Sequence, residues 1–190
     1  RCHRRLFGEV TADCFAGISE ETAHDRSVAQ LYERRMTIVG GRVRERMKLY
    51  GSAGMYQPPE AYAAEAAGIA GLGFSAYKMR PALGPDEDLR TVRLMREAIG
   101  PSVDIMVDAH SWWRMGDRSY GLERVEKLAE QMAEFEILWL EEPLPPLDHA
   151  AYRKLRASGS VALASGEHEP SEASFADLIL DPCVDYAQMD

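Results

Sequence analysis

The chain has 190 residues, of which 46% are hydrophobic and 28% charged, a balance typical of a globular domain with a sizeable core. Its net charge is −9, without a long basic cluster or an apolar run near the ~18 residues of a transmembrane helix, which argues against nucleic-acid and membrane partners. The three cysteines are odd in number and lack metal-like spacing, and the start has no signal-peptide pattern, so we expect a cytoplasmic location.

Residues 1–39 are polar and carry one plausible helix, over 20–35, and no clear strand. The pair Gly40-Gly41 indicates a hinge between this segment and the rest of the chain. We therefore predict two domains, a remnant of a separate N-terminal domain over residues 1–39 and a second domain over residues 40–190.

From residue 47 onward, strands and helices alternate. The predicted strands are 47–52, 76–80, 104–108, 137–141, 161–165 and 186–190. The predicted helices are 59–70, 86–99, 122–135, 147–157 and 171–180. A doubly wound open sheet would give the same rhythm, but polar residues end successive strands and no Gly-rich phosphate loop follows the first strand, which favours a (β/α) TIM-type barrel. Eight strands close such a barrel, so we expect about six of the eight here and the other two in a longer parent protein.

Three carboxylates follow apolar runs at predicted strand ends, at Asp108, Glu141 and Glu167. The intervals of 33 and 26 residues match the length of one strand-helix unit. The carboxyl ends of parallel strands meet on one rim, where three carboxylates would repel one another without a cation between them. A hard, oxygen-preferring divalent ion, Mg²⁺, is the simplest candidate. Each residue alone could equally well be a solvated strand end or a helix cap.

Basic residues flank this predicted site. Lys78 and Arg80 face the same way at one strand end, and His110 shares a side with Asp108. Such a pocket suits removal of the proton next to a substrate carboxylate, with Lys78 as base or electrostatic partner and Arg80 as carboxylate anchor. His110 could give a proton to a departing hydroxyl. The alternatives are charged residues that reach solvent, for Lys78 and Arg80, and a packed loop residue, for His110.

Neighbouring polar residues are expected to have lesser roles. Glu142 should be a salt-bridge partner in the rim, because adjacent strand residues diverge. His168 should point away from Glu167, and His149 should lie at the surface.

Five short segments at these strand ends carry a family pattern. They are Tyr-Lys-Met-Arg at 77–80, Val-Asp-Ala-His at 107–110, Trp-Leu-Glu-Glu-Pro at 139–143, Ser-Gly-Glu-His at 165–168 and Gln-Met-Asp at 188–190. Together with the turn Gly-Gly-Arg-Val-Arg at 40–44, they resemble the mandelate racemase/muconate-lactonizing branch of the enolase superfamily. The resemblance covers about residues 40–190.

This resemblance implies an α+β lid domain on a modified barrel, with Mg²⁺ on Asp108, Glu141 and Glu167. It implies that Asp190 is the acidic half of a His-Asp dyad whose histidine would follow the next strand. The Asp-Ala-His spacing is similar to that of acid-sugar dehydratases, in which such a histidine protonates the leaving hydroxyl. The second-strand pattern of the branch is Lys-x-Lys, and Arg80 replaces its second lysine.

We therefore predict a Mg²⁺-dependent hydro-lyase that dehydrates a sugar acid, an aldonate or aldarate, to a 2-keto-3-deoxy acid. A full-length homo-oligomer and an inactive isolated chain are also expected. The alternatives are a racemase or epimerase of a carboxylate in the same superfamily, or a truncated copy without activity.

Overall fold

The computed structural model describes residues 9–11, 46–81 and 83–189 of the chain. The chain divides into two units, residues 1–50 and 51–190. In the first unit, β1 (Glu9–Thr11) pairs antiparallel with β2 (Arg46–Lys48), so the N-terminal segment has a strand that the sequence did not predict. The predicted helix over 20–35 lies outside the described residues, as does the boundary at 39/40, which stays a prediction.

The second unit is built on a parallel six-stranded sheet. Its strands are β3 (Gly51–Met55), β4 (Ala76–Arg80), β5 (Asp104–Asp108), β6 (Trp139–Glu141), β7 (Leu163–Ser165) and β8 (Tyr186–Ala187). Each strand pairs with the next in chain order, without the reversal that marks a doubly wound sheet. The predicted strand over 47–52 is divided between the end of β2 and the start of β3. The order confirms the wall of a (β/α) barrel.

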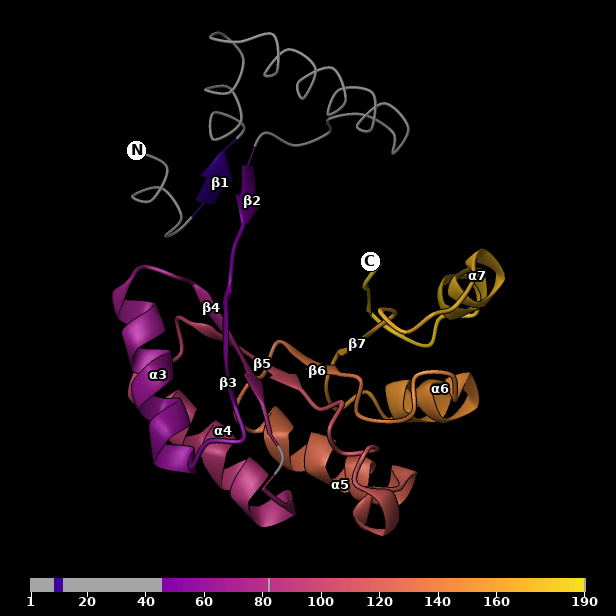
Figure 1. Ribbon diagram of the computed structural model, residues 1–190, viewed down its shortest axis with the longest axis horizontal. Helices are drawn as coiled ribbons and strands as arrows, with labels where there is room; N and C mark the ends of the chain where they lie inside the picture. Colours follow the sequence, from indigo (N-terminus) through magenta and orange to yellow (C-terminus); the bar gives the residue numbers. More distant parts are fainter. Residues whose placement is uncertain (1–8, 12–45, 82, 190) are drawn as a thin grey trace, which may run out of the picture. The chain divides into compact units, whose positions relative to one another are not determined.

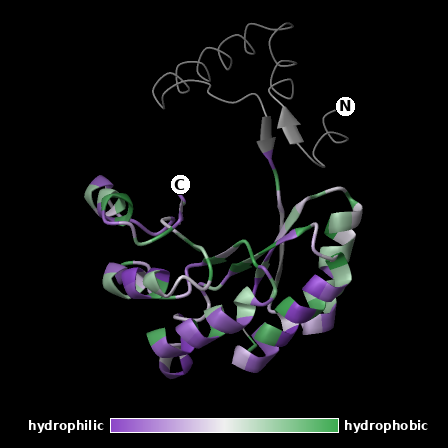
Figure 2. Ribbon diagram, turned by 180° about the vertical axis from the view of Figure 1, so that it is seen from behind, coloured by the Kyte–Doolittle hydropathy of each residue, from purple (hydrophilic) through white to green (hydrophobic). Residues whose placement is uncertain are grey.

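The helices cover the outside of this wall. They are α3 (Pro59–Gly71), α4 (Pro85–Ile99), α5 (Leu122–Ala133), α6 (His149–Ser158) and α7 (Glu172–Leu180), with a short 3₁₀ turn, η2 (Gly116–Arg118). In Figure 1 they follow one another in an arc beside the strands. Figure 2 shows hydrophilic and hydrophobic residues on the same helices, as expected when one helix face packs on a sheet. Within the described residues, no helix has the length and apolar character needed to cross a bilayer.

Local sequence signals account for the helix starts. Pro59 and Pro85 stand at the first turns of α3 and α4, where a missing N–H costs little. The carboxylate of Asp148 accepts a hydrogen bond from the Ala151 N–H at the start of α6. Ser171 and Ser174 form a reciprocal cap on α7.

Strand alternation separates the core from the site. Tyr77 and Met79 of β4 and Ile105 and Val107 of β5 are fully buried and belong to the core under the helices. Because successive side chains point to opposite faces, Lys78 lies on the other face, towards the inside of the barrel wall. The helices thus fix the sheet, and the sheet's inner face is left for polar groups.

Gly166 makes the turn that leads from β7 to Glu167. Its φ of +139° lies where side-chain-bearing residues rarely go. A Cβ at this position would clash with the backbone carbonyl of Gln188 and lie 3.0 Å from the ring of Phe175. The close passage of the chain after β8 therefore requires glycine here.

Replacing Gly166 with alanine should lower the free energy of unfolding by roughly 1–3 kcal/mol, because the backbone strain and the clash act together. Gly68→Ala is the matched control. Gly68 is exposed within α3 and has open space around its Cα, so alanine there should stabilise by about 0.5–1 kcal/mol. Urea denaturation measures both changes, and equal stabilities for the two variants would contradict the assignment of strain to Gly166.

Asp88 ties α4 to the segment after β5 that carries His110. Its carboxylate accepts hydrogen bonds from the Leu83 N–H at 3.1 Å, the Trp112 indole at 3.0 Å and the Tyr120 hydroxyl at 3.4 Å. Burial raises the pKa of Asp88 to about 6, although these donors act in the opposite direction.

This pKa shift predicts a pH dependence of stability. Between about pH 4 and pH 6 the folded state holds the Asp88 proton more tightly than the unfolded state, so this group's contribution to stability falls as pH rises through that window. The difference in unfolding free energy between the parent chain and Asp88→Asn should therefore change across pH 4–6 and be flat above about pH 7. A difference that stays constant over pH 4–7 would contradict the shift.

Candidate active site

Lys78 lies between two buried carboxylates at the carboxyl ends of the strands. Its ammonium nitrogen is 2.8 Å from Oε1 of Glu141 and 3.2 Å from Oδ2 of Asp108. Asp108 and Glu141 are register partners across β5 and β6, and their side chains are 3% and 1% exposed. The predicted convergence of Asp108, Glu141 and Lys78 is present in the structure. The alternative of a lysine that reaches solvent does not apply, because the Lys78 side chain is 6% exposed.

Asp108 is the most connected of these carboxylates. Its Oδ2 also accepts a hydrogen bond from Nε of Arg80 at 2.8 Å, and its Oδ1 is 2.6 Å from Nδ1 of His110. Burial alone would raise the pKa of Asp108, but His110, Arg80 and Lys78 outweigh burial and hold it well below its usual range. Asp108 is thus a permanent anion at neutral pH.

Arg80 and His110 reach the same carboxylate from β4 and from the segment after β5. The hydrogen bond to Asp108 raises the pKa of Arg80 further, with smaller contributions from the charges of Glu141 and Glu167. Arg80 therefore remains a cation, suited to binding a carboxylate and unsuited to removing a proton. His110 contacts Asp108 through Nδ1, and its side chain is 15% exposed.

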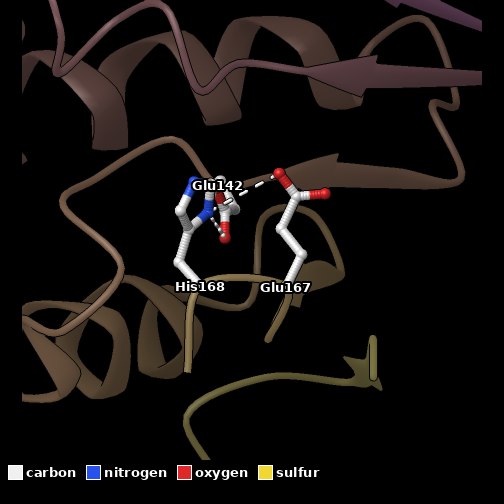
Figure 3. A group of neighbouring side chains, drawn as sticks. All are labelled: Glu142, Glu167 and His168. Carbon is white, nitrogen blue, oxygen red and sulfur yellow. Dashed lines mark hydrogen bonds and ion pairs between the residues drawn. The ribbon is translucent and has the colours of Figure 1, made fainter. Parts of the chain in front are cut away.

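Glu142 and His168 form a second pair beside this group. Nδ1 of His168 lies 3.0 Å from Oε1 and 2.8 Å from Oε2 of Glu142, which confirms Glu142 as an ion-pair residue. Glu167 comes within 3.5 Å of the same nitrogen, so His168 does not point away from Glu167 as predicted (Figure 3). The cause is the backbone, since Gly166 precedes Glu167 at positive φ and strand alternation no longer applies. Burial raises the pKa of Glu142, and His168 partly offsets this.

Aromatic and basic side chains hold this pair in place. The Trp113 indole donates to the backbone carbonyl of Glu142 at 3.0 Å, and its ring meets the His168 ring edge-on. Arg114 stacks over Trp113 and donates to Nε2 of His168 at 3.0 Å. Glu142 has a φ of +43°, a strained value for this residue, and strain of this kind is concentrated at functional sites.

Comparison with known families decides the relationship of the chain. Residues 61–190 match the model of the enolase C-terminal domain-like family, which is well over half of the chain. The chain belongs to the enolase superfamily. The resemblance predicted from the strand-end segments is thereby confirmed.

Several enolase-superfamily relatives share this sequence and fold. D-galactarolactone cycloisomerase of Agrobacterium fabrum is 33% identical over 135 residues, 68% of this chain and 34% of that protein. D-gluconate dehydratase of Thermoproteus tenax is 29% identical over 174 residues, 85% of this chain and 33% of that protein. The crystal structure of 3,6-anhydro-D-galactonate cycloisomerase from Zobellia galactanivorans has a TM-score of 0.72 at 28% identity, covering 95% of this chain and 49% of that one. The chain spans about a third of the length of these two curated relatives.

The donor atoms at this enolase-superfamily site suit a hard cation. Asp108 and Glu141 offer buried carboxylate oxygens from paired strands, and a positive charge, the Lys78 ammonium, already lies between them. Oxygen donors of this kind are what hard divalent ions prefer. Glu167 is 38% exposed and its ion pair is with His168, so the ligand set of Asp108, Glu141 and Glu167 stays a prediction. Asp190 lies outside the described residues.

Some functional contacts escaped the sequence reasoning. The Trp139 indole donates to Oε2 of Glu141 at 3.1 Å, a contact that the two-residue spacing on one strand could have indicated. Arg114 carries no comparable signal, because its partner is 54 residues away. His149 was expected at the surface, but its side chain is 11% exposed and lies between Glu169 and Asp177.

Removing the Lys78 ammonium should destabilise the fold. Lys78→Met leaves Glu141 buried without its cation, while Asp108 keeps Arg80 and His110, so we expect a loss of about 3 kcal/mol, at the low end for a broken buried pair. The control, Lys154→Met on the exposed face of α6, should change stability by less than about 0.5 kcal/mol. Denaturant titration at pH 7 checks both, and similar values for the two variants would show that Lys78 does not neutralise the carboxylates.

Proposed function

We propose that the protein to which this chain belongs is a Mg²⁺-dependent sugar-acid dehydratase, a carbon–oxygen lyase acting on an aldonate or aldarate. The observation that carries the proposal is the Asp108–Glu141 carboxylate pair with Lys78, Arg80 and His110 in direct contact. The similarity to a D-gluconate dehydratase over 85% of the chain supports it.

The proposed metal ligands are Asp108, Glu141 and Glu167. Mg²⁺ there would neutralise negative charge that develops on the substrate carboxylate. The Lys78 ammonium is then free to contact the substrate, since the ion takes over its electrostatic role between Asp108 and Glu141.

Arg80 and Lys78 are the proposed binding groups for the substrate carboxylate. A guanidinium paired with Asp108 cannot take the α-proton, which argues for a single base elsewhere. We propose that this base is a histidine paired with Asp190. A one-base site fits dehydration better than racemisation, which needs acid–base groups on both faces of the α-carbon.

His110 is the proposed general acid. Its Nδ1 faces Asp108, whose negative charge stabilises the imidazolium, and this leaves Nε2–H to protonate the departing β-hydroxyl. The α-proton goes to the base, the C–O bond breaks, water leaves with the His110 proton, and the resulting enol tautomerises to a 2-keto-3-deoxy acid. Oxidation and reduction balance within the substrate.

A racemase or epimerase is the second candidate, and relatives of this chain include cycloisomerases, which also act on sugar-acid derivatives by name. A copy without activity is the third. Both are separated from the dehydratase by what happens after the α-proton is removed.

Replacing His110 with asparagine tests the reaction in the protein that carries this chain. We expect turnover of the active aldonate or aldarate to fall by about 10²–10⁴-fold, the usual contribution of a general acid, while exchange of the α-proton with D₂O continues. Proton NMR follows the exchange, and a 2-keto acid assay follows the product. If dehydration and exchange both continue unchanged, the dehydratase assignment is wrong.

Magnesium binding can be tested on the chain itself. Millimolar Mg²⁺ should raise its melting temperature, because an ion that binds the native state stabilises it by about 2.7 kcal/mol at 100 times Kd. Asp108→Asn should abolish the increase. Asp104→Asn, at the exposed start of the same strand, should keep it. An equal shift in both variants would place Mg²⁺ elsewhere.

A further inference from the structure

The second group, Glu142, Glu167 and His168, has a geometry of its own. One donor atom from each residue, a carboxylate oxygen or the imidazole nitrogen, lies within 4.8 Å of the other two. Figure 3 shows the three side chains directed towards one another. We propose that this group binds a divalent ion of the borderline class, such as Co²⁺ or Zn²⁺, with two oxygen ligands and one nitrogen ligand.

The state of Glu142 gives an independent reason to expect a ligand. The side chain is 1% exposed, and its Oε2 is buried without any hydrogen bond among the described residues, although it lies in ion-pair range of His168. The other oxygen, Oε1, receives His168 at 3.0 Å and the Ser165 hydroxyl at 3.4 Å. A buried carboxylate oxygen without a hydrogen bond is costly, and a metal ion at this position would satisfy it.

The imidazole of His168 is already aimed at this point. Its Nδ1 lies 2.8 Å from Oε2 of Glu142 and 3.5 Å from Oε1 of Glu167. Arg114 donates to Nε2, so Nε2 is an acceptor and Nδ1 carries the proton in the neutral ring. When Nδ1 binds the ion, its proton transfers to Nε2, and the exposed Arg114 must move away. Arg114 therefore opposes metal binding.

The nitrogen ligand separates this group from the proposed Mg²⁺ site. Imidazole favours Zn²⁺, Co²⁺ and Ni²⁺, whereas Mg²⁺ prefers oxygen ligands alone. The two ligand sets share Glu167 but differ in every other residue, so the inference does not rest on the proposed function.

Titration of the metal-free chain with Co²⁺, followed by visible absorption, tests the inference. We expect one site with bands typical of mixed nitrogen and oxygen ligation, and competition by Zn²⁺. His168→Gln and Glu142→Gln should each weaken Co²⁺ binding by at least about 10-fold. His149→Gln is the matched control, because His149 also contacts two carboxylates, and it should leave Co²⁺ binding unchanged.

Two further variants keep the result interpretable if His168→Gln fails to fold, which far-UV circular dichroism would detect. Arg114→Ala should tighten Co²⁺ binding several-fold, since an opposing cation is removed. Asp108→Asn should lose the Mg²⁺ stabilisation and keep Co²⁺ binding, which separates failure of this inference from failure of the proposed function. Co²⁺ binding that is absent, that survives His168→Gln in a folded protein, or that is lost in His149→Gln would overturn the proposal.

Discussion

Two buried carboxylates on neighbouring strands need a positive charge between them, and this requirement governs the site. Asp108 and Glu141 face each other across β5 and β6 with almost no access to water. In a poorly solvated position their repulsion is strong, and leaving either unpaired would cost several kcal/mol. Lys78 meets the requirement from β4, and it can do so because the three strands are parallel neighbours with their carboxyl ends aligned.

The same requirement gives the site its chemistry. A position that stabilises a cation between two carboxylates is one where a metal ion can replace Lys78, and where an anionic substrate can then be held by Lys78 and Arg80. Asp108 is the point of coupling, since it contacts Lys78, Arg80 and His110 at once. Binding an ion at Asp108 would therefore change the surroundings of all three basic groups.

Backbone strain is found next to the carboxylates. Glu142 has a φ of +43° and Gly166 a φ of +139°, and each directly adjoins a predicted metal ligand. These two turns break strand alternation, so that Glu142, Glu167 and His168 converge instead of pointing to opposite faces (Figure 3). The result is a second set of ligand atoms that shares Glu167 with the predicted Mg²⁺ set and adds an imidazole nitrogen.

The sequence by itself determined the barrel wall and the convergence of Asp108, Glu141, Lys78, Arg80 and His110. Hydrophobic periodicity and the two-residue alternation of strands are local properties, and parallel pairing aligns the strand ends that they predict. Only the tertiary structure decided that His168 turns towards Glu167, that Glu142 keeps a buried oxygen without a hydrogen bond, and which residues hold them. Those outcomes depend on positive-φ turns and on side chains such as Arg114 that arrive from other parts of the chain, and neither leaves a periodic signal in the sequence.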